Sequence, residues 1–206
     1  MNYPAKILMK NRSPSVERIC AAAVAHFAEF GYDGSSLNDI AEQVGIRKAS
    51  LYAHFSGKDA LFLEVYSDAL EKETEFVHAC FAIEGAYGTG EQYCRMIARR
   101  YADSVYLRYL LRTAFLPPAV LRDAVVQGYE GFMQVLRDLF CTGLAHRFML
   151  EAKEVSVYAD AYLGIVDSLH VELVYASEAA FERRRAALWR ILSDSLAQAP
   201  VARQGA

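Results

Sequence analysis

The sequence predicts an all-α protein: an N-terminal three-helix domain with a helix-turn-helix, followed by a larger helical body, about nine helices in all. Apolar residues recur at the spacing of amphipathic helices along nearly the whole chain, and no stretch shows the alternation of a convincing strand. Serine, glycine and proline stand where one helical pattern ends and the next begins. Residues 1–58 carry a net charge of +2 and residues 59–206 one of −5, which suits a polyanion contact confined to the N-terminal domain.

The composition indicates a globular protein with a core of ordinary size. Of its 206 residues, 54% are hydrophobic and 23% are charged. The longest apolar stretch of low charge, residues 20–28, is too short to span a membrane, and residues 1–12 lack the apolar segment of a signal peptide. We therefore expect a cytoplasmic protein with a flexible basic arm over residues 1–12. Its four widely spaced cysteines are Cys20, Cys80, Cys94 and Cys141, which we expect to be reduced thiols.

The first three predicted helices have clear start and stop signals. Ser13 followed by proline is an N-cap with proline in the first helical position, and Gly31 ends that helix. The capping box Ser36–Asp39 starts the second helix, and Gly45 ends it. A short third helix follows at about residues 47–54. Three residues in and beside this helix are expected to face inward: Ile46 before it, Leu51 within it and Phe55 after it.

The body is predicted from residue 59 onward. A second box, Ser56–Asp59, starts a long fourth helix that runs toward Cys80, and residues 85–90 are rich in turn formers. The pair Pro117-Pro118 forces a boundary, because proline restricts the residue before it and lacks an N–H. The remaining helices are expected at residues 91–104, 105–115, 119–146, 154–175 and 178–196, with a loop at 147–153 and a frayed tail from Ala199.

Residue identities in the N-terminal domain are more specific than the pattern of helices. The segments 27–32, 35–41, 44–55 and 58–61 closely resemble the TetR family of repressors, most specifically at Leu51-Tyr52-x-His54-Phe55 followed by Lys58. The resemblance covers about the first 60 residues. The later part resembles the family only in its helix count, its helix lengths and the stretch Leu163-Gly-Ile-Val-Asp-Ser-Leu169. The resemblance implies a nine-helix fold, a dimer built on the last two helices, and release from DNA when a small molecule binds.

The helix-turn-helix supplies the candidate DNA contacts. The resemblance places Ser36, Tyr52, His54 and Lys58 on backbone phosphates, where a helix cap or a solvated polar side chain is the alternative for each. The expected base readers are Arg47 and Lys48, which can donate to guanine, Ser50, which can pair with several base edges, and Ala49, which can touch a thymine methyl group. Asn38 could reach adenine or a phosphate, and Arg47, where many family members have a small polar residue, could also contact phosphate.

The body is rich in aromatic residues, with 10 of the 13 tyrosines and 8 of the 11 phenylalanines. The resemblance places several of its helices around a ligand cavity, so we expect a small apolar or aromatic inducer. For each candidate pocket residue given below, the alternative is ordinary packing in the core. Asp160 and Asp167, seven apart on one helix face, either accept a cationic ligand or are capped, hydrated or paired with Arg or Tyr. The candidate pocket residues are Tyr93, Met96, Tyr101, Tyr106, Phe115, Phe132, Met133, Phe140 and Tyr162.

The last two predicted helices carry apolar faces that could build a symmetric four-helix interface between two copies. The candidate interface residues are Ile165, Val166, Leu169, Leu173, Phe181, Leu188, Ile191, Leu192 and Leu196. The expected partners are thus palindromic operator DNA, a small-molecule inducer and a second copy of the chain, with no membrane and no cofactor. The alternative is a DNA-organising or interaction protein with the same helix-turn-helix and no inducer. An enzyme is not expected, because the sequence shows no nucleophile elbow, glycine-rich phosphate loop or metal-ligand spacing.

Overall fold

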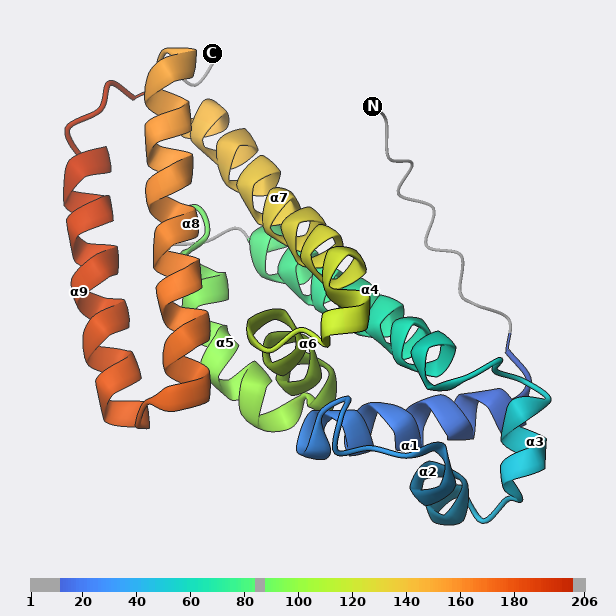
Figure 1. The fold of residues 1–206 in the computed structure, drawn as a ribbon. Helices are drawn as coiled ribbons and strands as arrows, with labels where there is room; N and C mark the ends of the chain where they lie inside the picture. The colour runs from blue at the N-terminus through green and yellow to red at the C-terminus, as the bar shows by residue number, and fades with distance from the viewer. Residues whose placement is uncertain (1–11, 84–87, 202–206) are drawn as a thin grey trace. The chain divides into compact units, whose positions relative to one another are not determined.

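The computed structural model describes residues 12–83 and 88–201, and within them it confirms the all-α class (Figure 1). Of the predicted basic arm, only Arg12 lies among the described residues. The chain divides into two compact units within one helix, between Val65 and Tyr66. The elements in order are α1 (Pro14–Phe30), α2 (Leu37–Val44), α3 (Lys48–Tyr52), α4 (Lys58–Ala82), α5 (Glu91–Asp103), α6 (Val105–Phe115), the 3-10 helix η1 (Ala119–Leu121), α7 (Arg122–Arg147), α8 (Ala152–Tyr175) and α9 (Glu178–Leu196).

The first unit is built on α1, whose ends follow the local sequence signals. The Ser13 hydroxyl accepts a hydrogen bond from the Val16 N–H at 3.4 Å, and Gly31 takes a φ of 72° at the other end. Phe27 on the buried face of α1 is inaccessible to solvent and meets the ring of Phe62 from α4 edge-on, with 4.9 Å between the ring centroids. The short helices α2 and α3 and the first turns of α4 complete this unit, which thus contains the three predicted helices.

In the second unit, α7, α8 and α9 pack in sequence, and the later part of α4 lies against α7 (Figure 1). The hydroxyl of Tyr66 donates to the carbonyl oxygen of Val125 at 2.8 Å, joining α4 to α7. Gly128 permits this close approach, because a Cβ atom there would lie 2.7 Å from the Tyr66 ring. Phe140 and Tyr162 stack in the core with centroids 4.2 Å apart, so α7 and α8 share an aromatic centre.

Besides shifts of one or two residues at the ends of α3, α5 and α7, four boundaries differ from the sequence-based expectations, each with a hydrogen-bonding cause. The helix predicted at residues 119–146 begins as η1, because the Leu121 N–H bonds to the Pro118 carbonyl three residues earlier at 3.0 Å. Helix α8 begins at Ala152, inside the predicted loop, since Glu151 and Glu154 form a capping box. Helix α4 begins at Lys58, so Gly57 rather than Ser56 directly precedes it, and the Gly57 carbonyl accepts from the Leu61 N–H at 3.2 Å.

The fourth difference is the segment that follows α9. A frayed tail from Ala199 was expected, and that expectation is wrong for residues 199–201. The Met149 N–H donates to the Pro200 carbonyl at 2.7 Å, and Phe148 and Val201 form an isolated antiparallel bridge. The segment between α7 and α8 therefore supplies the backbone partners that hold residues 200 and 201 in place.

Candidate DNA-binding surface and ligand cavity

The turn of the helix-turn-helix depends on Gly45. This residue takes φ 75° and ψ 31°, the left-handed conformation, and its N–H donates to the Glu42 carbonyl at 3.0 Å. The next N–H, of Ile46, reaches back to the Ala41 carbonyl at 2.9 Å. These two bonds satisfy the last carbonyls of α2 and turn the chain sharply into α3. A glycine is favoured because a Cβ atom costs energy at this φ.

Helix α3 presents a polar face on a single buried anchor. Leu51 is inaccessible to solvent, whereas the other four residues of α3 are exposed. The four predicted base readers lie together on this short helix and at its N-cap, all of them exposed: Arg47, Lys48, Ala49 and Ser50. Tyr52 is 49% exposed, and the Lys48 ammonium lies 5.9 Å from the centroid of its ring. The sequence-predicted residues thus form one exposed surface, although their roles on DNA stay predictions.

The other three predicted phosphate contacts, Ser36, His54 and Lys58, differ in whether their polar groups already bond within the protein. Ser36 caps α2, its hydroxyl accepting from the Asp39 N–H at 3.2 Å, so the cap alternative holds for this residue. Its O–H hydrogen remains able to donate to a phosphate. His54, and the possible base or phosphate contact Asn38, are both exposed.

Lys58 is the exception, because its ammonium group is already bound. The Lys58 Nζ donates to the carbonyl oxygens of Tyr32 at 2.9 Å and Ser35 at 3.2 Å, and it lies 3.9 Å from the centroid of the Tyr32 ring. The Tyr32 hydroxyl donates to the Asp59 carboxylate. Burial, followed by that hydrogen bond, raises the pKa of Tyr32 to about 12. Lys58 therefore fixes the loop between α1 and α2. The sequence contained all of these residues, but their contacts become visible only when α4 is placed beside that loop.

The comparison with known families matches this unit. Residues 19–65 fit the model of the bacterial regulatory proteins of the tetR family. The chain thus carries the N-terminal domain of the TetR family. A similar stretch of 46 residues is 48% identical to IcaR, the negative transcriptional regulator of the biofilm operon icaADBC in Staphylococcus aureus strain Newman. It covers 22% of this chain and 25% of IcaR, so the match spans about a quarter of that relative.

Solved structures extend the likeness from this TetR domain to the fold of both units. A TetR transcriptional regulator from Chloroflexus aurantiacus superposes with a TM-score of 0.69 at 21% identity, covering 91% of this chain and 97% of that one. The regulator FadR from Bacillus subtilis, solved in complex with stearoyl-CoA, gives a TM-score of 0.64 at 17% identity, covering 85% and 96%. At these identities the likeness shows the fold, a helix-turn-helix domain with a helical body.

Several predicted pocket residues of the body are packed in its core. Tyr93, Phe132, Phe140 and Tyr162 are each no more than 2% exposed. Met133 is 9% exposed, while Met96, Tyr101 and Phe115 are half-buried. Core packing, the alternative reading, thus describes four of these aromatic rings in this structure. Whether they also line a ligand cavity stays a prediction.

At the centre of this aromatic group is His170, to which the sequence analysis gave no role. The Tyr93 hydroxyl lies 2.9 Å from its Nε2 and the Tyr129 hydroxyl 2.8 Å from its Nδ1. Burial lowers the pKa of His170 to about 3, so the ring is neutral, with one donor and one acceptor nitrogen. Tyr129 also donates to Asp167 at 3.4 Å. The bonds are consistent if Nδ1–H donates to Tyr129 while Tyr93 donates to Nε2.

The two aspartates follow the alternative in which they pair. Asp160 accepts from the Arg137 guanidinium, and Asp167 accepts from Tyr129. Burial raises the pKa of Asp167. A cationic ligand is therefore not needed to explain either carboxylate.

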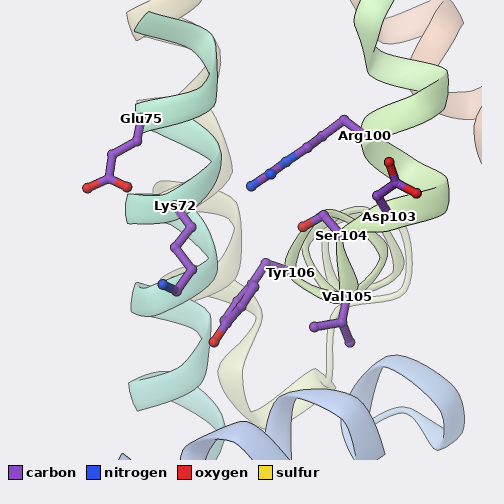
Figure 2. A pocket seen from close by; sticks show the side chains of 7 residues that line it. All are labelled: Lys72, Glu75, Arg100, Asp103, Ser104, Val105 and Tyr106. Atoms are coloured by element: carbon purple, nitrogen blue, oxygen red, sulfur yellow. The ribbon is translucent and has the colours of Figure 1, made fainter. Parts of the chain in front are cut away.

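A cavity of about 380 Å³ lies in the second unit among α4, α5 and α6 (Figure 2). Of the predicted pocket residues, only Tyr106 lines it. Its other lining side chains are mostly charged, including Lys72 and Arg100, neither of which the sequence analysis singled out. The sequence indicated only weakly that these charged residues line a cavity, because charged residues on helices usually face solvent.

The candidate interface residues on α8 and α9 are also distributed differently from the expectation. Six of the nine are buried within the protomer, where their side chains pack against its own helices: Ile165, Val166, Leu169, Phe181, Leu192 and Leu196. Leu173 and Leu188 are half-buried, and Ile191 is 70% exposed.

Among the described residues no helix is long and apolar enough to cross a membrane.

Proposed function

We propose that this chain is a ligand-responsive transcriptional repressor, acting in the cytoplasm on nucleoid DNA, that binds palindromic operator DNA as a homodimer. The observation that carries the proposal is the exposed face of α3, where Arg47, Lys48, Ala49 and Ser50 stand on the anchor Leu51 in a unit that matches the TetR family. In a helix-turn-helix the second helix enters the major groove, and its N-terminal residues meet the base edges. The side chains present there can read guanine and the thymine methyl group.

The proposed phosphate contacts are compatible with the same placement of α3. Tyr52 and His54 follow the base-reading residues at the exposed end of α3 and just beyond it. Their hydroxyl and imidazole groups can donate to phosphate oxygens. Lys58, held by the loop carbonyls, is assigned chiefly to supporting this surface.

The second copy is proposed to bind at apolar residues that one protomer leaves uncovered on α8 and α9. Val157, Tyr175 and Ile191 are 61%, 68% and 70% exposed, and Val171 is 40% exposed. Large apolar side chains at this exposure on two packed helices suit a symmetric interface, in which each copy covers the same patch of the other. This places the dimer on the predicted helices but largely on other residues of them.

The experiment that tests the proposal is selection of bound duplexes from a random DNA pool. The expected result is a palindromic consensus whose half-sites are one helical turn apart, roughly 34–36 Å between the reading helices. A pool that never enriches, or one that enriches a single half-site bound by a monomer, would contradict it.

Release by a small molecule is the second part of the proposal. It is supported by the cavity in the second unit and by the fold shared with FadR, whose solved structure holds stearoyl-CoA. The inducer must bind the arrangement that cannot hold DNA more tightly, and DNA must weaken inducer binding by the same factor. A coupling free energy of about 1–3 kcal/mol would lower operator affinity about 5- to 150-fold. If every stabilising compound leaves operator affinity unchanged, the DNA-organising alternative without an inducer is favoured.

A further inference from the structure

Two residues that line the cavity among α4, α5 and α6, Arg100 and Ser104, bind a buried carboxylate that does not line it. Glu73 on α4 is only 1% exposed, and it accepts two hydrogen bonds from Arg100, at 3.0 Å from Nε and 2.9 Å from Nη2. The Ser104 hydroxyl donates to the same carboxylate at 2.8 Å. The Arg100 guanidinium also lies 4.8 Å from the centroid of the Phe76 ring. This pair of a partly exposed guanidinium and a buried carboxylate is neutral overall, and the carboxylate accepts three hydrogen bonds, so the pair attracts neither sign of charge strongly.

Two carboxylates line the cavity, Glu75 and Asp103, and Asp103 has a basic neighbour. Asp103 on α5 lies 3.5 Å from Nε of Arg99, one turn earlier on the same helix. Two charges of the lining remain, and both are on α4: the ammonium of Lys72 and the carboxylate of Glu75. Neither forms an ion pair within residues 12–83 or 88–201, although they are three residues apart.

The position of Lys72 explains why this pair does not close. Its Nζ lies 5.0 Å from the centroid of the Tyr106 ring on α6, which is the geometry of a cation–π contact. Figure 2 shows Lys72 and Glu75 extending from neighbouring turns of α4, while Arg100 and Tyr106 reach toward that helix from α5 and α6. The lining of one cavity thus includes an ammonium and a carboxylate that form no ion pair within residues 12–83 or 88–201, together with an aromatic ring.

We propose that this cavity binds a small zwitterion, a molecule with one carboxylate and one ammonium group joined by a short chain. Its carboxylate pairs with Lys72, its ammonium pairs with Glu75, and its chain lies against Tyr106. A volume of about 380 Å³ is in the lower range for small-molecule sites, which suits a metabolite of modest size. A simple anion meets the carboxylate of Glu75, and a simple cation meets the ammonium of Lys72, so each is disfavoured relative to a molecule carrying both charges.

This inference deepens the proposed function, on which its effect on DNA rests, and it replaces the apolar inducer expected from aromatic composition. The six polar or charged side chains among the seven that line the cavity carry that change of ligand class. Binding itself does not depend on DNA, so the two parts can be tested apart.

The binding test uses titration calorimetry of the full chain with glycine, γ-aminobutyrate and ε-aminocaproate at up to millimolar concentration. Caproate and hexylamine, which carry the same chain as ε-aminocaproate with one charge each, are the comparison probes. We expect at least one zwitterion to bind, and its singly charged analogues to bind at least about two- to fivefold more weakly, because each lacks one contact to an exposed charge. Failure of all three zwitterions, or equal binding of caproate or hexylamine, overturns the proposal.

Variants then locate the site. K72M and E75Q should each weaken zwitterion binding about two- to fivefold, because each removes one of the two charge contacts and ion pairs of exposed residues contribute at most about 1 kcal/mol. K153M on α8, an exposed lysine outside the cavity lining, is the matched control and should bind like the wild type. If K153M and K72M behave alike, the zwitterion binds elsewhere and this site is rejected.

Operator titration with and without the bound zwitterion separates this inference from the proposed function. A zwitterion that binds through Lys72 and Glu75 but leaves operator affinity unchanged upholds the site and rejects ligand-induced release. Release of operator by some other compound, with no zwitterion bound in the calorimeter, rejects the site and leaves the repressor function standing.

Discussion

At the scale of single residues, Gly45 is the clearest case in which backbone conformation dictates the side chain. Its φ of 75° disfavours any Cβ, although no atom lies within 4 Å of where one would be built. G45A should therefore lower the free energy of unfolding by about 1 kcal/mol through backbone strain alone. G131A is the opposite control, since Gly131 lies exposed within α7 with open space around it and no positive φ.

The control should raise stability by about 0.5–1 kcal/mol, because alanine is the better helix former. Urea unfolding followed by circular dichroism measures both changes. Equal effects of the two substitutions would show that the strain at Gly45 is not the cause.

His170 gives a prediction about pH. Its pKa is lowered to about 3 by burial, against about 6.5 in an unfolded chain. Below pH 6.5 the unfolded chain therefore takes up a proton that the folded protein does not, and stability falls as the pH drops from about 6.5 toward about 3. Between about pH 7.5 and about pH 5 this costs about 2 kcal/mol.

H170Q removes the titrating group while its amide can still bond Tyr93 and Tyr129. Its stability should depend on pH less steeply than that of the wild type, as measured by urea unfolding at the two pH values. H78Q on the exposed face of α4 is the control and should keep the wild-type dependence, because that side chain meets solvent when folded. Identical slopes for wild type and H170Q would mean that His170 is not held neutral.

At the scale of elements, substitutions in and beside α3 should distinguish residues that read base sequence from residues that position the helix on the phosphate backbone. R47A should relax preference at one base pair of each half-site and cost about 1–3 kcal/mol there, because arginine donates to guanine in a fixed geometry. Y52F should remove only the proposed phosphate contact of Tyr52, so it should weaken consensus and random DNA alike. Fluorescence anisotropy with both kinds of duplex distinguishes them. Equal weakening by R47A on both duplexes would instead assign Arg47 to phosphate.

Helix ends show how far local sequence reaches. The starts of α1 and α2 were predictable because Ser13 and Ser36 cap residues three positions away, and Gly31 and Gly45 end those helices through their own φ. The contacts of Lys58 were not, since its partners Tyr32 and Ser35 are more than twenty residues distant in the chain. The exposed residues of α3 could be predicted, because the limits of this helix and its buried Leu51 follow from neighbouring residues in the sequence.

At the scale of the whole molecule, composition proved ambiguous where local signals were clear. Aromatic residues that line a cavity and those that stack in a core have the same helical spacing, and Phe140 and Tyr162 turned out to stack. Likewise, an apolar face on α8 or α9 can cover its own protomer or a second copy. Ile165 and Leu192 are buried within the protomer, whereas Ile191 is exposed. Which face is which depends on the packing of helices far apart in sequence.

The exposed part of that face leads to a prediction about assembly. If Ile191 is covered by a second copy, I191D places a charge in an apolar interface and should shift the protein to a monomer in sedimentation at micromolar concentration. Operator affinity should fall at least about tenfold, because each half-site would then be bound without its partner. V120D is the matched control, since Val120 in η1 is also 70% exposed but lies outside α8 and α9. It should remain a dimer with wild-type affinity. A wild-type protein that is monomeric yet binds the full operator specifically, or an I191D variant that stays dimeric, would place the interface elsewhere.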